Sequence, residues 1–255
     1  MAEKVNIYTE PAPGWILRRG AEELVRHAPE MFRISDHPAE VNYFLNYATY
    51  RDVPGWSVAM FTHLEEKGHT RRRFFEVSQA VDRAISMCEK TRAIITHSNW
   101  MSGDVPVIHF GSDSRLDRKP LFGVVGRTYG SGRKGEHLVA RMMEDGILVR
   151  CWGKGWPCEE WAPGSKWEDL PDFYAAIDYL LITSMNEGGP IPLIDAIRAG
   201  VPVIAPRGVG WCDEFPCIRY DAGRWDSLHA VLHKLTHPPT WEQWAEQHVE
   251  FFSVL

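Results

Sequence analysis

Short apolar runs rich in β-branched and aromatic residues alternate in this chain with segments whose apolar residues recur every three or four positions. The short runs predict buried strands, and the periodic segments predict amphipathic helices. Their alternation predicts βα units with parallel sheets, an α/β fold. The predicted strands are residues 5–8, 58–61, 93–96, 105–110, 121–125, 147–152, 179–184 and 201–205, and the predicted helices are residues 20–27, 74–89, 135–144, 170–177, 190–199 and 225–235.

The division of the chain follows from a polar segment, residues 109–120, which separates two series of βα units. We therefore expect two Rossmann-like domains, residues 1–112 and 113–238, a division that a chain of 255 residues accommodates. After Pro238-Pro239, apolar residues again fall at helical spacing. Residues 239–255 are therefore predicted to form an amphipathic helix that packs back toward the first domain.

The composition narrows the classes of protein that are possible. Hydrophobic residues make up 44% of the chain, and the formal net charge of −6 gives no general attraction for nucleic acid. The five cysteines are odd in number and lack CxxC spacing, which argues against a disulfide framework and against a zinc ribbon. These cysteines fit a reducing cytoplasm best, and no apolar run reaches about 18 residues. We therefore expect a cytoplasmic location and no transmembrane segment.

One stretch, residues 178–206, reads strand, Gly-rich turn, helix, Gly and strand. Pro190 suits the first helical position, and Gly188-Gly189 before it would let a ligand approach the positive end of the helix. Glu187 precedes this helix and Asp195 lies inside it, about 8 Å further along the axis. The two carboxylates are suited to hold separate parts of one long ligand, although a capping role for Glu187 and a solvated one for Asp195 remain open.

A second stretch, FGVVGRTYGSGRKGEH, places a basic Gly-rich loop between a predicted strand and a predicted helix. The loop carries Arg127, Arg133 and Lys134, and it fits neither the P-loop pattern nor GxGxxG. A basic loop at a strand end beside a helix N-terminus is a favourable place for a diphosphate. The same charges could instead be solvated loop residues.

These motifs together resemble a known family. The second half of the chain is similar to the nucleotide-sugar-binding domain of the GT-B glycosyltransferases, in particular the retaining family 4, through the motifs VGR, KG and then TS..EGGP....D....G.PVIAP. The preceding segment, VPVIHFGSDSRLD, resembles that group's interdomain strand and linker. The order of motifs agrees over about residues 93–215. The resemblance implies a GT-B fold, with two Rossmann-like domains facing a central cleft, here in a version of minimal size.

The resemblance also implies roles for residues of the second half. Glu187 and Asp195 stand where the family has two acidic residues separated by seven others, the first at the sugar hydroxyls and the second at the ribose. Arg127 and Lys134 match the pair that neutralises the donor diphosphate, with Arg133 a further candidate. The other expected donor contacts are Gly188, Gly189, Pro190 and Ile191.

The first half carries fewer matches. His63 follows a predicted strand and resembles the family's histidine near the reacting sugar, and Gly14 stands where the family has a Gly-rich loop near the donor phosphate. Trp15 is a candidate for the acceptor. A dense basic run, KGHTRRRFF, suggests a phosphate-bearing acceptor or an anionic lipid surface, although a solvated helix start is the simpler interpretation. Its candidate residues are Arg71, Arg72 and Arg73.

The expected activity is transfer of a sugar from a nucleotide diphosphate sugar to an acceptor hydroxyl. Positive charges must stabilise the departing diphosphate. Because the chain lacks a DxD motif, we expect no metal and no other cofactor. The family resemblance further implies retention of configuration. The acceptor stays open and could be a small molecule, a glycan or DNA. Three alternative functions also stay open: a phage-type glycosyltransferase acting on hydroxymethylated DNA bases, a sugar-nucleotide epimerase or hydrolase, and a non-catalytic nucleotide-sugar-binding protein. Peripheral membrane contact has no further support.

Overall fold

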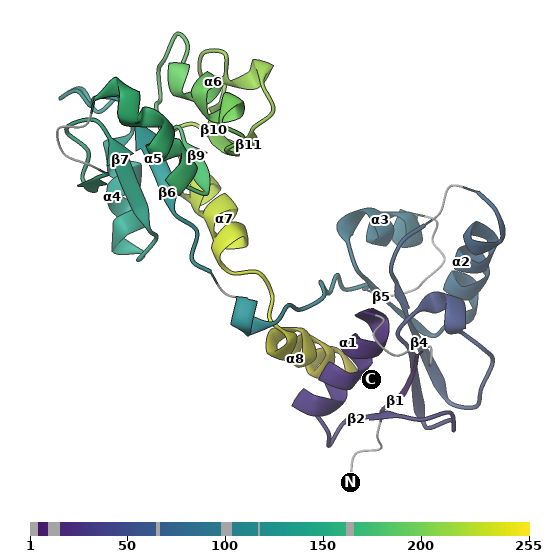
Figure 1. Cartoon of the computed structure of the whole chain (residues 1–255). Coiled ribbons are helices and arrows are strands. Elements are labelled where there is room, and N and C mark those ends of the chain that lie inside the picture. Colours follow the sequence, from purple (N-terminus) through teal and green to yellow (C-terminus); the bar gives the residue numbers. More distant parts are fainter. Residues whose placement is uncertain (1–4, 10–15, 65–66, 98–103, 117, 162–165) are drawn as a thin grey trace. The chain divides into compact units, whose positions relative to one another are not determined.

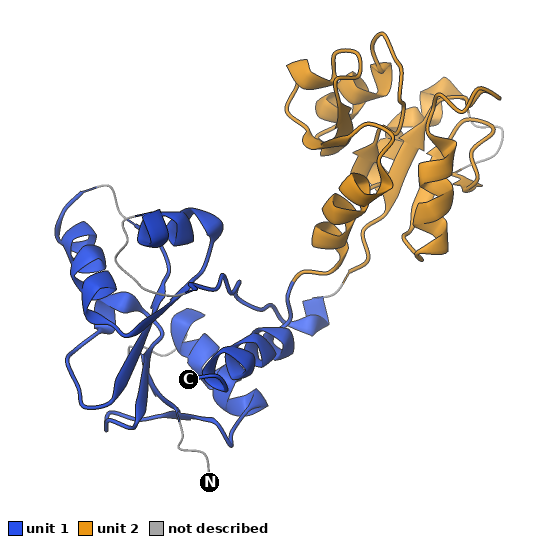
Figure 2. Ribbon diagram, turned by 180° about the vertical axis from the view of Figure 1, so that it is seen from behind, with its two compact units in different colours: residues 1–117, 239–255 blue, residues 118–238 orange. Residues whose placement is uncertain are grey.

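The computed structural model describes residues 5–9, 16–64, 67–97, 104–116, 118–161 and 166–255. The chain forms two compact units (Figure 2). Unit 1 consists of Met1–Asp117 together with Pro239–Leu255, and unit 2 is Arg118–Pro238. The boundary expected at residue 112 therefore lies at Asp117, and the last segment of the chain returns to unit 1.

The described residues of unit 1 form a five-stranded sheet in the order β2-β1-β3-β4-β5, with every neighbouring pair parallel. Figure 1 labels β1, β2, β4 and β5 of this sheet. Side chains of α1 and α8 cover one face of this sheet, and side chains of α2 and α3 cover the other. The strands are β1 (Val5–Tyr8), β2 (Phe32–Ile34), β3 (Val41–Phe44), β4 (Trp56–Phe61) and β5 (Arg83–Ser86), and the helices are α1 (Ile16–His27), α2 (His69–Ala80), α3 (Glu89–His97) and α8 (Trp241–Phe252).

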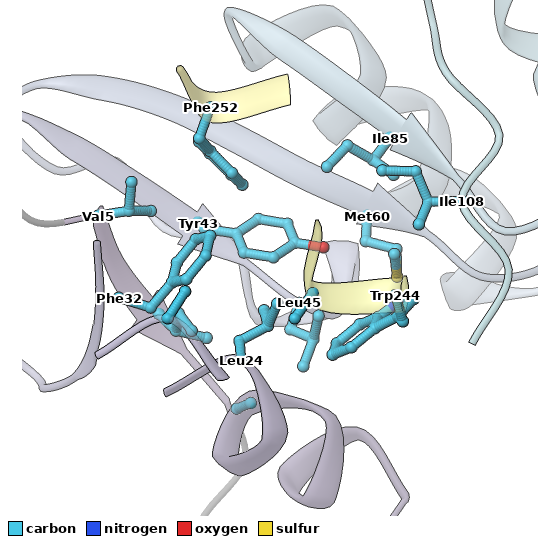
Figure 3. Packing of buried hydrophobic residues seen from close by; sticks show 14 of the residues in the cluster. Val5, Leu24, Phe32, Tyr43, Leu45, Met60, Ile85, Ile108, Trp244 and Phe252 are labelled. Carbon is cyan, nitrogen blue, oxygen red and sulfur yellow. The ribbon is translucent and has the colours of Figure 1, made fainter. Parts of the chain in front are cut away.

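The core of unit 1 joins the two ends of the sequence. Trp244 and Phe252 of α8 pack with Tyr43 of β3 and Leu24 of α1 in one buried cluster (Figure 3). The helices α1 and α8 approach closely because α1 has a glycine at their contact: a Cβ on Gly20 would lie 3.1 Å from the Trp244 ring. The amphipathic pattern of residues 241–252 thus buries its apolar side in unit 1.

The described residues of unit 2 form a six-stranded parallel sheet in the order β11-β10-β9-β6-β7-β8. Side chains of α4 and α7 pack on one face, and side chains of α5 and α6 pack on the other. The strands are β6 (Phe122–Val125), β7 (Val149–Trp152), β8 (Glu159–Glu160), β9 (Tyr179–Leu181), β10 (Val203–Arg207) and β11 (Ile218–Asp221), and the helices are α4 (Glu136–Glu144), α5 (Leu170–Ala176), α6 (Ile191–Arg198) and α7 (Trp225–Thr236).

The α/β class with two parallel sheets, predicted from the sequence, is confirmed. Among the predicted elements of unit 1, the strand at residues 93–96 and the helix at residues 74–89 are wrong. Residues 93–96 belong to α3, where Thr91 and Ile95 are the buried residues, at helical spacing. The predicted helix 74–89 is instead α2, which ends at Ala80, followed by β5. In both places a short apolar run is compatible with either structure, and tertiary packing decides.

Several strands lie outside the predicted set, namely β2, β3, β5, β8 and β11. Residues 105–110, predicted as a strand, pair with the sheet only at a single bridge between Val107 and Ser86. Pro106, which has no backbone N–H, accepts a hydrogen bond from the Ser86 amide through its carbonyl.

None of the described helices has the length and apolar character needed to cross a membrane.

Candidate functional site

The candidate site lies at the carboxyl ends of β6 and β9, which are neighbours in the sheet of unit 2. From β6 the chain continues to β7 on one side, whereas β9 and β10 extend the sheet on the other. Ligands of open α/β sheets bind at such a change of direction. A small cavity of about 20 Å³ opens there, lined by Val125, Lys134, Trp156, Pro190 and residues 180–184 among others.

The basic loop after β6 is fixed to the segment after β9 by hydrogen bonds to the loop's backbone carbonyls. The Thr183 hydroxyl donates a hydrogen bond to the Lys134 carbonyl at 2.5 Å, and the Met185 amide donates to the Arg133 carbonyl at 2.9 Å. Gly135 has a φ of 74°, and a Cβ there would lie 2.2 Å from the Thr183 carbonyl oxygen. Only glycine permits the backbone at position 135 to lie this close to Thr183, and this contact places Lys134 at the ends of β6 and β9.

Glu187 is the centre of a charged cluster. Lys134 Nζ forms an ion pair and hydrogen bond with Oε1 of Glu187, and the Ser184 hydroxyl donates to the same oxygen at 3.0 Å. Arg133 Nη1 lies 3.4 Å from Oε2. Burial alone raises the pKa of Glu187, but Lys134, Ser184 and Arg133 together outweigh it, so the pKa lies below the usual range of a glutamate. Glu187 is therefore ionised at neutral pH and only accepts hydrogen bonds.

As predicted, a glycine-rich turn leads from Glu187 into a helix, but this helix, α6, begins one residue later than expected. Pro190 is the N-cap, and α6 begins at Ile191 rather than at the proline. Gly188 is exposed and has open space where a Cβ would be, whereas a Cβ on Gly189 would lie 2.7 Å from the ring of Trp211. Gly189 thus allows the Trp211 ring to pack against the backbone, whereas Gly188 leaves open space beside the N-terminus of α6.

The structure brings some of the candidate residues of unit 2 together and leaves others apart. Arg133, Lys134 and Glu187 form one cluster. Asp195 is half-buried, at the fifth position of α6, and Ile191 is exposed at its first. Arg127 is exposed, and within the part of unit 2 that the structure describes no hydrogen bond or ion pair joins it to Glu187.

The candidates of unit 1 lie on different elements. His63 is exposed just after β4, with Nδ1 3.0 Å from the Thr62 hydroxyl oxygen. Gly14 and Trp15 lie outside the described residues. No finding tests the roles predicted for these residues, which stay predictions.

The three arginines of the basic run lie in the first turns of α2, which begins at His69, not in front of a helix that begins at Phe74. Arg71 and Arg72 are exposed. Arg73 is half-buried: its guanidinium lies over the Tyr50 ring and donates to the Tyr50 carbonyl. Arg71 lines a groove of about 710 Å³ together with basic and apolar residues, namely Leu64, Phe75, Lys90, Ala93, Ile94 and His97.

Two residues at the site in unit 2 were not singled out by sequence reasoning. Trp211 packs on Gly189, and the Trp156 indole N–H donates to the Gly126 carbonyl at 2.8 Å while its side chain lines the cavity. Trp156 lies 30 residues from Gly126, so local spacing carries no signal for the contact. The GKGW sequence around it does carry a partial signal, because two glycines beside a tryptophan indicate close backbone approach.

Among solved structures the chain is similar to several proteins of low sequence identity. TarM shares 11% identity, with 82% of this chain and 51% of TarM covered and a TM-score of 0.38, so the chain spans about half of that protein. HepE from Anabaena in complex with UDP-glucose shares 11%, covering 98% and 99%, with a TM-score of 0.36. Sucrose-phosphate synthase from Thermosynechococcus elongatus shares 15%, covering 93% and 77%, with a TM-score of 0.41.

The comparison with protein families identifies one segment. No curated protein matches the chain. Residues 160–216 match the model of the family described as glycosyl transferases group 1. This segment runs from β8 past β10 and contains both Glu187 and Asp195. The resemblance to glycosyltransferases that the sequence motifs indicated is thus confirmed, on the segment that contributes the acidic half of the candidate site.

Proposed function

We propose that this protein transfers a sugar from a nucleotide diphosphate sugar to an acceptor hydroxyl. The observation that carries the proposal is the pairing of Lys134 with Glu187 where β6 and β9 end, in a chain whose residues 160–216 match glycosyl transferases group 1. A cation and an ionised carboxylate in contact can bind two different parts of a nucleotide diphosphate sugar. The cation suits a phosphate, and the carboxylate suits sugar hydroxyls.

The reaction requires positive charge where the diphosphate departs. As the bond between sugar and phosphate breaks, negative charge grows on the leaving diphosphate, and fixed cations stabilise it. Lys134 is held by the contacts of its backbone to Thr183, and Arg133 lies beside it. Arg127, exposed at the start of the same loop, is the further cation that we assign to the diphosphate. The N-terminus of α6 adds partial positive charge.

Glu187 has a different part in the proposal. Because its carboxylate stays ionised, it cannot donate a proton to the leaving group, and it acts by accepting hydrogen bonds from sugar hydroxyls. Asp195 on α6 is assigned to the ribose. We further propose that configuration is retained, that no metal takes part, and that the departing diphosphate receives the proton of the acceptor hydroxyl, so no protein nucleophile is needed.

Binding and turnover test the proposal separately. Thermal shifts with UDP, GDP and ADP identify the base, and mass spectrometry then follows UDP-glucose or the corresponding sugar nucleotide with candidate acceptors. We expect Lys134→Ala and Glu187→Gln to lose transfer by at least about 100-fold, on the scale of losing a charged transition-state contact. The matched controls are Lys234→Ala on α7 and Glu144→Gln on α4, both exposed.

The outcomes separate this function from its alternatives. Sugar found on an acceptor, and lost in the two site variants only, supports the proposal. Consumption of the donor with no acceptor would instead indicate an epimerase or a hydrolase. Binding of a nucleotide diphosphate sugar without any turnover would indicate a binding protein, and full transfer by both site variants would overturn the assignment of the site.

A further inference from the structure

The loop between β7 and β8 lies against the start of the basic loop. The Gly126 amide donates to the Trp152 carbonyl at 2.8 Å, and the Thr128 amide donates to the Lys154 carbonyl at 3.1 Å. The Thr128 hydroxyl donates to the Gly155 carbonyl at 2.9 Å. The two segments therefore run together beyond the end of the strand pairing between β6 and β7.

Glycines make this close approach possible. Gly153 has a φ of 117°, and a Cβ there would lie 2.2 Å from the Gly126 carbonyl oxygen. Gly155 has a φ of 88°, and a Cβ there would lie 2.2 Å from the Thr128 hydroxyl oxygen. Both positions combine positive φ with a close contact, to the Gly126 backbone at Gly153 and to the Thr128 side chain at Gly155, so glycine is strongly favoured at both. The contact is thus built into the backbone of both segments.

Trp156 completes the contact from the same loop. Its indole N–H donates to the Gly126 carbonyl at 2.8 Å, and its half-buried side chain lines the cavity that Lys134 and Pro190 also line. The Gly126 carbonyl and the Arg127 amide belong to one planar trans peptide, whose C=O and N–H point in opposite directions. Holding that carbonyl therefore sets the direction of the Arg127 amide and the path of the chain at Arg127.

Gly126 is a weak point in this arrangement. Its φ is 115°, a conformation that only glycine adopts readily, and glycine offers little resistance to rotation of the next peptide. The indole hydrogen bond is a side-chain contact that restrains this peptide. A residue that acts in this way positions another group and does not itself touch the reacting atoms.

We propose that Trp156 is a positioning residue for the donor diphosphate, because it fixes the Gly126–Arg127 peptide and so the place of Arg127. This inference rests on the proposed function, in which Arg127 meets the diphosphate. It adds to the donor site a residue from the loop between β7 and β8, outside the motifs that the sequence offered.

The test uses Trp156→Phe, which keeps an aromatic ring and removes the N–H donor. We expect kcat for the donor to fall about tenfold while its KM changes less than about threefold, since one hydrogen bond and a small displacement of Arg127 are lost. Trp156→His, whose ring can donate, should recover part of kcat. Trp225→Phe on α7 is the matched control and should leave kcat unchanged.

A second measurement does not depend on turnover. Hydrogen exchange of the Gly126 and Thr128 amides should accelerate by at least about tenfold in Trp156→Phe and remain unchanged in Trp225→Phe. Unchanged exchange would overturn the restraint, and faster exchange with an unaltered kcat would overturn the positioning role. If the native protein transfers no sugar from any donor, the proposed function fails, and the exchange measurement alone decides whether Trp156 restrains this peptide.

Discussion

Tyr43 and His248 meet in the core of unit 1, with the Tyr43 hydroxyl oxygen 3.0 Å from Nε2 of His248. Nδ1 of the same ring lies 2.8 Å from the Trp244 carbonyl oxygen. Since a carbonyl only accepts, Nδ1 carries the proton, and Nε2 accepts from the Tyr43 hydroxyl. Burial lowers the pKa of His248 to about 4, so α8 is attached to β3 through a neutral histidine.

This histidine predicts how the stability of unit 1 depends on pH. Between about pH 6.5 and about pH 4 the unfolded chain binds a proton at His248 that the folded unit does not. The contribution to stability is complete above about pH 6.5 and is lost as the pH falls, by up to about 1.4 kcal/mol per pH unit. Urea unfolding between pH 4.5 and 7.5 measures it. His248→Gln should remove this slope, whereas the half-exposed His229→Gln in unit 2 should not.

The cluster around Glu187 predicts a dependence of the same sign in unit 2. Since its folded pKa lies below the usual value, the stabilisation is present above about pH 4.3 and is lost as the pH falls through the folded pKa. Glu187→Gln should lower the free energy of unfolding by about 1–2 kcal/mol at neutral pH. The difference from the native protein should shrink toward pH 3. An equal loss at every pH, or the same loss in Glu144→Gln, contradicts the prediction.

The two glycines before α6 should respond differently to the same substitution. Gly189→Ala would place a Cβ 2.7 Å from the Trp211 ring, and we expect it to destabilise unit 2 by about 1–3 kcal/mol. Gly188→Ala has open space, so unit 2 should keep its stability within about 0.5 kcal/mol while nucleotide-sugar binding weakens. Thermal denaturation and donor binding separate the two effects. Equal stability of the two variants would refute the packing role of Gly189.

The cysteines should differ in reactivity. The Thr91 hydroxyl, as the largest influence, lowers the pKa of the half-buried Cys88. The Cys158 thiol and burial raise the pKa of Cys151. Because the thiolate is the nucleophile, iodoacetamide at pH 7.5 should label Cys88 before Cys151, as peptide mass spectrometry would show. Thr91→Val should slow the labelling of Cys88, and labelling of Cys151 first would contradict the assignment.

The sequence was most informative where glycines mark the ends of a helical segment between two apolar runs. Residues 178–206 were predicted in the order of β9, α6 and β10 because Gly188-Gly189 precede the helical segment and Gly200 follows it. β3 was not predicted, although it has the same length as β1 and an asparagine, Asn42, at the same position as Asn6 in β1. The Asn42 side chain is buried and bonds to the carbonyls of Ala39 and Pro54, a pairing that periodicity does not reveal. The contact of Trp156 with Gly126 was not predicted either, because it depends on how two loops pack together, which periodicity does not reveal.

The return of α8 to unit 1 has a consequence for how the protein is made. The ribosome delivers the sheet of unit 1 first, then all 121 residues of Arg118–Pro238, and only afterwards the helix that covers one face of that sheet. Until Trp244 and Phe252 emerge, the apolar face around Tyr43 lacks part of its cover. Unit 2, which is continuous in sequence, can complete its core before unit 1 does. The order of synthesis is therefore the reverse of the order in which the two cores close.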